Sequence, residues 1–146
     1  MSVSVAPMRW WHIEELAPIE ADLFGEEQWS AAMFWNELAG GHHYLVALDD
    51  GTLAGYAGLS VGDGEAWVQN LAVRKGQQRR GIGGTLLAAL LAEADRRGAR
   101  TVLLEVAVDN APAQRLYDRY GFEPVGIRRG YYQPSNTDAV VMRRDG

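Results

Sequence analysis

Cysteine is absent from the 146 residues of this sequence. Its absence excludes a disulfide framework, a thiolate metal site and a cysteine nucleophile together. No segment approaches the roughly 18 consecutive apolar residues of a membrane-spanning helix, and residues 1–11 contain no apolar stretch after a basic start. We therefore expect a soluble, cytoplasmic protein without a membrane partner.

Basic residues are missing from a long part of the chain. Between Trp10 and Val73 there is no Lys or Arg but there are eleven acidic residues, whereas Arg74 to Gly146 holds thirteen basic residues against eight acidic ones. A cationic substrate bound partly by the first half and a polyanionic small molecule bound by the second half would explain this division, but unevenly distributed surface charge explains it equally well. The net charge of -5 disfavours nucleic acid as a partner.

The composition, 47% apolar and 23% charged, and the absence of repeats or linkers predict one α/β domain over residues 1–146. Helical periodicity, with Ser30 as an N-cap and Gly98 and Gly121 as stops, predicts helices at 11–24, 31–39 and 82–97 and from 111 to 120. Strand patterns lie at 44–48, 53–61, 66–73, 101–108, 122–131 and 137–143. The strand, helix, strand order in the middle of the chain predicts a parallel pair.

The most informative motif is Gln-Arg-Arg-Gly-Ile-Gly-Gly-Thr at residues 78–85, between a predicted strand and a predicted helix. Glycines allow close approach of a ligand, and the amides and positive dipole at a helix start favour phosphate. It is not a Walker loop, because no Lys follows its last glycine, and Leu86 stands where a Rossmann motif needs glycine. Taken alone, a glycine-rich turn before an ordinary helix remains the simpler interpretation.

In its full context, with Gln-Arg-x-Gly-x-Gly after a strand that ends Leu-Ala-Val, the motif resembles the pyrophosphate-binding motif of the GNAT acetyltransferases. The resemblance implies acetyl-CoA as co-substrate and the GNAT fold: a central, mixed and mostly antiparallel sheet of about seven strands, splayed near the cofactor site, with helices on both faces. The residues that it implies for cofactor binding are Leu71, Ala72, Val73, Arg79, Arg80, Gly81, Ile82, Gly83, Gly84, Thr85, Asn110, Ala113 and Tyr117.

The second half resembles more narrowly the RimI-type protein N-terminal alanine acetyltransferases. The residues that carry this resemblance are Leu104-Glu105-Val106, Asn110, Ala113, Leu116-Tyr117, Gly121-Phe122, Arg128-Arg129, Tyr131-Tyr132 and Asp138-Ala139. It implies acetyl transfer to a protein N-terminus, with the eighteenth protein of the small ribosomal subunit as substrate. Gln28-Trp29-Ser30 stands where the family often has Pro-Trp-Ser, and Ala107 where Arg is common. Both departures concern the acceptor and not acetyl-CoA.

Acetyl transfer to an amine needs a base, because an N-terminal amine with a pKa of about 7.7 to 8.0 is mostly protonated near neutral pH. Glu105 lies near the end of an apolar strand, where we expect desolvation to raise its pKa. The resemblance assigns Glu105 the role of general base, acting directly or through water. From the residues alone, a strand-end glutamate in a surface ion pair is the simpler interpretation.

The thiolate of CoA leaves more readily if an acid protonates the sulfur, and the resemblance implies Tyr117 for this step. The position of Tyr117 on an apolar helix stripe fits core packing as well, and Asn110 fits a helix N-cap as well as a cofactor contact. The resemblance places a backbone amide at the end of the 71–73 strand near the thioester carbonyl. Because cysteine and a Gly-x-Ser-x-Gly motif are absent, we expect direct transfer in a ternary complex.

The acidic first half and the paired tyrosines favour a peptide as acceptor. The candidate substrate-binding residues are Glu26, Glu27, Trp29, Tyr131, Tyr132 and Asp138. Adjacent His42 and His43 face opposite ways on an extended chain, and we predict no metal site. The alternatives are a GNAT enzyme that acetylates lysine side chains or a small-molecule amine, a CoA-binding module without catalysis, and a ribosome-associated structural protein. A module that only binds CoA needs neither Glu105 nor Tyr117, so this pair argues against that alternative. The net negative charge argues against a structural protein of the ribosome.

Overall fold

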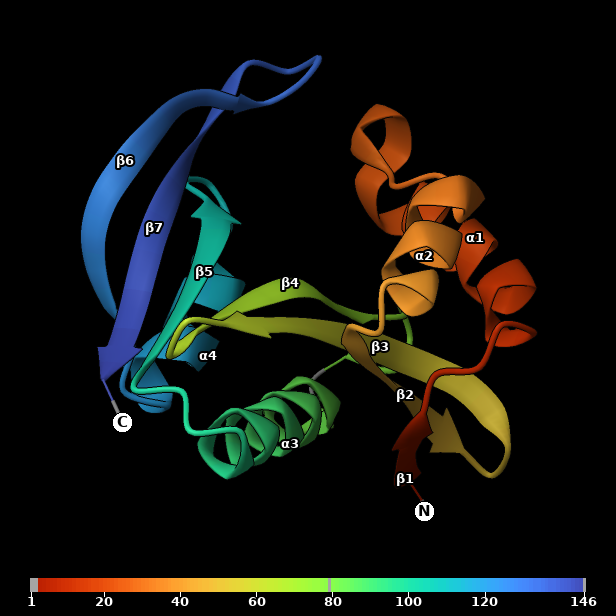
Figure 1. Cartoon of the computed structure of the whole chain (residues 1–146). Coiled ribbons are helices and arrows are strands. Elements are labelled where there is room, and N and C mark those ends of the chain that lie inside the picture. The colour runs from red at the N-terminus through yellow and green to blue at the C-terminus, as the bar shows by residue number, and fades with distance from the viewer. Residues whose placement is uncertain (1–2, 79, 146) are drawn as a thin grey trace.

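Within residues 3–78 and 80–145, which the computed structural model describes, seven strands form one mixed sheet in the order β1-β2-β3-β4-β5-β7-β6 (Figure 1). The strands are β1 (Val3–Pro7), β2 (His43–Asp49), β3 (Thr52–Gly62), β4 (Glu65–Val73), β5 (Thr101–Ala107), β6 (Glu123–Tyr132) and β7 (Thr137–Asp145). Neighbouring strands pair antiparallel except β4 and β5, which are parallel as the strand, helix, strand order predicts.

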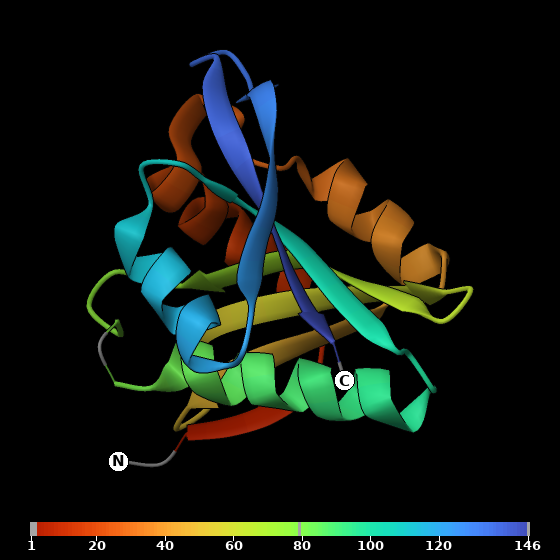
Figure 2. The same cartoon turned by 90° about the vertical axis from the view of Figure 1, so that its left-hand side faces the viewer.

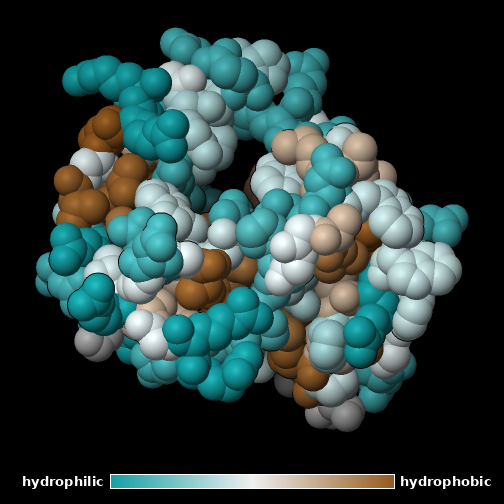
Figure 3. All heavy atoms as spheres, in the orientation of Figure 1, coloured by the Kyte–Doolittle hydropathy of each residue, from teal (hydrophilic) through white to brown (hydrophobic). Residues whose placement is uncertain are grey.

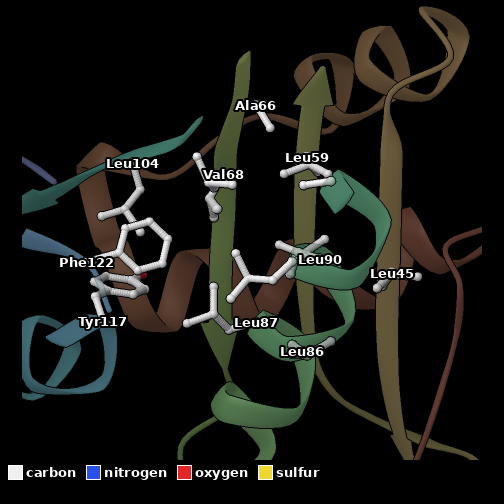
Figure 4. Close-up of a cluster of buried hydrophobic side chains, with 14 of the residues drawn as sticks. Leu45, Leu59, Ala66, Val68, Leu86, Leu87, Leu90, Leu104, Tyr117 and Phe122 are labelled. Carbon is white, nitrogen blue, oxygen red and sulfur yellow. The ribbon is translucent and has the colours of Figure 1, made fainter. Parts of the chain in front are cut away.

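Helices cover both faces of the sheet. They are α1 (His12–Phe24), the 3-10 helix η1 (Gly25–Glu27), α2 (Ala31–Ala39), α3 (Ile82–Arg96) and α4 (Ala111–Arg119). Figures 1 and 2 show α1 and α2 on one face and α3 and α4 on the other. Each face has its own apolar core, and in Figure 4 Leu87 and Leu90 of α3 lie against the strands that carry Leu59 and Val68.

The predicted helix signals act as expected. Ser30 accepts a hydrogen bond of 3.3 Å on Oγ from the Met33 amide, which caps α2, and Asn110 Oδ1 accepts one of 3.2 Å from the Ala113 amide, which caps α4. The predicted elements match the observed ones to within two residues. The exceptions are β1 and η1, which were not predicted, because a five-residue edge strand and one helical turn leave little periodic pattern.

Strands β4 and β5 separate along their length, as the predicted fold requires. They pair only where Glu65–Trp67 meets Thr101–Leu103, and their later residues diverge (Figure 1). Beyond this point the facing edges of β4 and β5 do not pair with each other, and a gap opens in the middle of the sheet. Among the described residues, no helix combines the length and apolarity needed to cross a membrane.

Candidate active site

A cavity of about 610 Å³ lies where β4 and β5 diverge. Its walls come from the second half of each strand, from the start of α4 and from the end of α1. Nine of the residues predicted from the sequence line it: Glu27, Trp29, Leu71, Ala72, Glu105, Asn110, Ala113, Tyr117 and Tyr132. Figure 3 shows the surface hollowed between the β6–β7 side and the α1–α2 side of the molecule. The tertiary structure thus brings together residues that are far apart in the sequence.

A second cavity, of about 370 Å³, adjoins the first. It is lined by predicted acceptor residues, Glu26, Glu27, Trp29, Tyr131 and Tyr132, and also by Met33 and Trp67. Six residues line both cavities: Glu27, Trp29, Val68, Gln69, Glu105 and Tyr132. Glu105 therefore lies at the junction of the two cavities, where two ligands bound one in each would meet.

The carboxylate of Glu105 has two different environments. Its Oε1 accepts a hydrogen bond of 2.9 Å from Nη1 of Arg128, whose guanidinium carbon lies 4.3 Å from the centre of the Tyr131 ring. Its Oε2 is buried and has no hydrogen-bond partner among the described residues, although the whole side chain is 12% exposed. The ion pair expected from the residues alone is therefore present, and the other carboxylate oxygen is buried beside both cavities. The role of Glu105 as general base stays a prediction.

Arg128 was not predicted as a site residue, although it belongs to the motif that carries the family resemblance. Its side chain is about half exposed and reaches Glu105 across β7, because β7 lies between β5 and β6. A pairing that depends on this strand order leaves no local signal in the sequence. Burial, and next the nearby carboxylate of Glu105, raise the pKa of Tyr131.

Tyr117 serves as a core residue and also lines the cavity. It is 6% exposed, and its ring packs edge-on against Phe122 with centroids 5.9 Å apart (Figure 4). Burial, and next the neighbouring Tyr132, raise the pKa of Tyr117 above its ordinary value.

The start of α3 has the geometry expected of an anion site. Gly81 is the N-cap with a φ of +79°, and the Thr85 amide, 3.0 Å from the Gly81 carbonyl oxygen, makes the first helical hydrogen bond. The amides that precede Thr85 in the first turn lack helical partners. The Thr85 hydroxyl donates to the same carbonyl at 3.0 Å. No residue of Gly81 to Thr85 lines either cavity, so any phosphate would lie outside both.

Gly83 and Gly84 have a packing role that the sequence did not reveal. A Cβ atom on Gly84 would lie 2.8 Å from the Tyr120 hydroxyl, and one on Gly83 would lie 3.3 Å from Cδ2 of Leu116. The Tyr120 hydroxyl donates a hydrogen bond of 3.2 Å to the Gly84 carbonyl oxygen. The two glycines therefore allow α4 to pack closely against α3, whatever the α3 amides bind.

Arg80 takes part in an ion pair. Its Nη1 lies 2.8 Å from Oδ2 of Asp49, at the end of β2, and also contacts the side-chain oxygen of Gln77. The hydrogen bond from Arg80 lowers the pKa of Asp49. Arg79, its predicted partner in phosphate binding, lies outside the described residues. At the end of β4, the Val73 carbonyl oxygen accepts a hydrogen bond of 3.0 Å from Gln78 Nε2.

Two predicted acceptor residues make contacts within the protein. Asp138 lines neither cavity; its Oδ1 accepts a hydrogen bond of 2.8 Å from the amide of Gly130, a residue with a φ of +59° in β6. Glu27 Oε2 accepts hydrogen bonds from the amide and the hydroxyl of Ser135, in the loop between β6 and β7. Asp138 therefore shapes the hairpin, and Glu27 joins the two sides of the site.

The histidines do not form a shared site. His42 Nε2 lies 3.7 Å from a carboxylate oxygen of Glu37, whereas His43 Nδ1 lies 3.9 Å from one of Glu93. In the part of the chain that the structure describes, no cluster of three His, Asp or Glu side chains could hold a metal ion.

Comparison with known proteins identifies the family. The model of the acetyltransferase (GNAT) family matches residues 6–122. The chain belongs to this GNAT family. Among curated relatives it is 46% identical over 138 residues to N-alpha-acetyltransferase RimI of Mycobacterium tuberculosis, covering 90% of this chain and 85% of the relative. It is 37% identical over 124 residues to the [ribosomal protein bS18]-alanine N-acetyltransferase of Escherichia coli, covering 80% and 84%.

Solved structures have the same fold. The crystal structure of the ribosomal-protein-S18-alanine N-acetyltransferase from Escherichia coli matches with a TM-score of 0.90 at 29% identity, over 99% of this chain and 94% of that one. A chain of the NatC complex bound to Gag peptide and CoA matches with a TM-score of 0.85 at 21% identity, over 100% and 99%, which shows a shared fold alone. The resemblance inferred from the sequence motifs is confirmed.

Proposed function

We propose that this GNAT protein transfers the acetyl group of acetyl-CoA to the N-terminal α-amine of a protein, and that the N-terminal alanine of a small-subunit ribosomal protein is its acceptor. The observation that carries the proposal is the position of Glu105, at the junction of two cavities with Oε2 buried and unpaired. The names of the relatives at 46% and 37% identity support this choice of acceptor.

The residues of the larger cavity and of the α3 start fit acetyl-CoA. The pyrophosphate would bind the free amides of the first turn of α3, where the helix dipole favours negative charge. The unpaired edges of β4 and β5 offer backbone donors and acceptors for the amide groups of the pantetheine arm. Asn110 and Ala113 line the same space. Bound there, acetyl-CoA supplies an activated acyl group.

Glu105 accepts the proton of the acceptor ammonium group on Oε2, directly or through one water molecule, and leaves a neutral amine. The amine nitrogen attacks the thioester carbonyl carbon, and a backbone amide near the end of β4 stabilises the negative charge on oxygen. The carbon–sulfur bond then breaks, and Tyr117 donates a proton to the sulfur. The attacking nitrogen loses its second proton, which restores the Tyr117 hydroxyl, and Glu105 releases the first proton to solvent. Arg128 fixes Oε1 and so orients the carboxylate of Glu105.

The smaller cavity fits the N-terminal segment of the acceptor. Glu26 and Glu27 favour a cationic segment, while Trp29, Tyr131 and Tyr132 offer aromatic faces and hydroxyl groups. The Tyr131 and Tyr132 rings pack edge-on with centroids 5.1 Å apart, which gives this wall a defined shape.

Peptide acetylation tests the proposal. The protein is incubated with acetyl-CoA and peptides that differ only in their first residue, and mass spectrometry locates the added acetyl group. The panel includes an N-terminally blocked peptide with an internal lysine, and a free small-molecule amine. We expect acetylation of the α-amine, with Ala as the preferred first residue. Acetylation confined to the lysine or to the free amine would contradict the proposal and support the alternative acceptors.

A further inference from the structure

Glu20 is the one charged side chain that is buried among the described residues. It lies in the last two turns of α1, is 2% exposed and lines the larger cavity. The Tyr56 hydroxyl donates to its Oε2 at 2.5 Å, and the Trp29 amide donates to its Oε1 at 3.2 Å. Burial raises the pKa of Glu20 against the effect of these two bonds. Burying a carboxyl group here costs more free energy than burying an apolar residue would, and its two hydrogen bonds offset part of that cost.

The segment that Glu20 holds forms one wall of the acceptor cavity. Residues 25–30 connect α1 to α2 and carry four of the residues that line it, Glu26, Glu27, Gln28 and Trp29. The Trp29 amide lies between the end of η1 and the cap of α2, where it has no partner within either helix. Its bond to Glu20 therefore holds the far end of this segment to α1, while the Gly25 amide holds the near end by donating to the Ala21 carbonyl oxygen.

The side chain of Trp29 is connected through Phe34 to Tyr56, the hydrogen-bond partner of Glu20. Its ring packs against Phe34 with centroids 5.2 Å apart, and Phe34 packs edge-on against Tyr56 at 5.9 Å. Phe34 and Tyr56 are fully buried. Tyr56 belongs to β3. Glu20 therefore links the Trp29 backbone to the sheet through the Tyr56 hydroxyl group, and Phe34 packs against the Trp29 ring.

We infer that Glu20 is a positioning residue for the acceptor site, and that it acts by holding Trp29 and the 25–30 segment against β3. The inference rests on the proposed function, because it takes the cavity lined by Trp29 as the place where the acceptor peptide binds. Loss of the two hydrogen bonds frees the Trp29 amide and the Tyr56 hydroxyl inside the protein. The segment then moves, and the wall of the acceptor cavity moves with it. The start of α3, where acetyl-CoA phosphates would bind, is unaffected.

The test compares Glu20→Leu, which keeps the bulk but not the hydrogen bonds, with Glu20→Gln, whose amide can accept from Trp29 and donate to Tyr56. For Glu20→Leu we expect the KM for an Ala-initiated peptide to rise roughly tenfold, with kcat and the Kd for acetyl-CoA within about twofold of wild type. Glu20→Gln restores most of the peptide affinity. Glu15→Leu, at an exposed position of the same helix, is the matched control and leaves the KM unchanged.

Tyr56→Phe removes one hydroxyl group and gives a second, milder variant if Glu20→Leu does not fold. We expect it to raise the peptide KM by a smaller factor in the same direction. An unchanged peptide KM in a folded Glu20→Leu or Tyr56→Phe protein would overturn the inference, and so would an equal loss of acetyl-CoA affinity.

A spectroscopic measurement separates this inference from the proposed function. In protein labelled with 5-fluorotryptophan, the Trp29 fluorine resonance is assigned with Trp29→Phe and is then followed in the Glu20 variants. We expect it to shift or broaden in Glu20→Leu and to recover in Glu20→Gln. This result would support the hold of Glu20 on Trp29 even if wild-type protein acetylated no peptide, in which case the proposed function alone would fail. An unmoved Trp29 resonance in Glu20→Leu would overturn the inference whatever the activity.

Discussion

Arg128 of β6 donates a hydrogen bond of 2.9 Å to Glu105 of β5 across the intervening strand β7. The bond uses one carboxylate oxygen and leaves the other buried and without a partner among the described residues. Fixing one oxygen restricts the rotation of the side chain, so the second oxygen has a defined place at the junction of the two cavities. This relationship is the basis of the first prediction.

Glu105→Gln should lower kcat by roughly 100-fold at neutral pH, the usual scale for loss of a general base, with little change in acetyl-CoA affinity. Gln keeps the shape of Glu but cannot take the proton from the acceptor ammonium group. The defect should shrink at a pH well above the amine pKa of about 8, where the acceptor is already neutral. Turnover of an Ala-initiated peptide between pH 6.5 and 9.5 provides the measurement, and a wild-type kcat at pH 7 would exclude Glu105 as the base.

Tyr117→Phe removes the hydroxyl group and keeps the ring in its contact with Phe122. We expect a fall in kcat that does not shrink at high pH, because the sulfur still leaves without a proton donor. The different pH responses of Tyr117→Phe and Glu105→Gln distinguish acid from base. If kcat were unchanged and only the thermal stability fell, Tyr117 would be a core residue alone.

Replacement of Arg79 and Arg80 together by Ala should weaken acetyl-CoA binding by at least ~1.5 kcal/mol, slightly more than tenfold in Kd, since both cations precede the α3 amides that we propose bind the pyrophosphate. Calorimetry measures this affinity. Asp49→Asn is the control, because it removes the charge of the carboxylate that pairs with Arg80 and keeps the cation. If Asp49→Asn and Arg80→Ala weakened binding equally, Arg80 would act by shaping its loop and not by contacting phosphate.

Trp29→Ala should raise the KM for the acceptor peptide and leave the Kd for acetyl-CoA unchanged. The Trp29 side chain lines both cavities, but the residues around it in the smaller one are those that fit a cationic peptide. Steady-state kinetics with each substrate varied in turn separates the two effects. A change in acetyl-CoA affinity alone would place Trp29 on the cofactor side.

Three buried tyrosines predict how stability responds to alkaline pH. Burial raises the pKa of Tyr44, Tyr56 and Tyr117 above the ordinary value of about 10. Below that value the hydroxyl groups are protonated in both states, so their contribution to stability is complete. Above it the unfolded chain releases protons that the folded protein retains, and the free energy of unfolding falls as pH rises, by up to ~1.4 kcal/mol per pH unit for each tyrosine.

Urea unfolding at pH 8, 9, 10 and 11 measures this effect. The contribution of these tyrosines to the free energy of unfolding should be nearly constant up to about pH 9 and should then decline. Tyr56→Phe should decline less steeply, because one of the three groups is gone. An identical slope in Tyr56→Phe and wild type would show that Tyr56 does not contribute to the alkaline loss.

Much of the fold could be predicted because its signals are local. Ser30 and Asn110 cap helices through hydrogen bonds to amides three residues on, and apolar residues recur along α3 with the period of a helix. The glycine-rich segment 78–85 also keeps its residue types and spacing within one short stretch. Such patterns depend on neighbours along the chain, so the sequence by itself determined all elements except β1 and η1, their order and the resemblance to GNAT enzymes.

Tertiary structure alone decided which distant side chains meet in the site. Arg128 meets Glu105 from 23 residues away, Tyr120 meets Gly84 from 36 and Ser135 meets Glu27 from 108. The first contact requires the strand order β5-β7-β6, the second requires α4 to pack on α3, and the third requires the loops of the two halves to approach over the cavity. These contacts form when separate elements pack together, and sequence spacing carries no information about that approach.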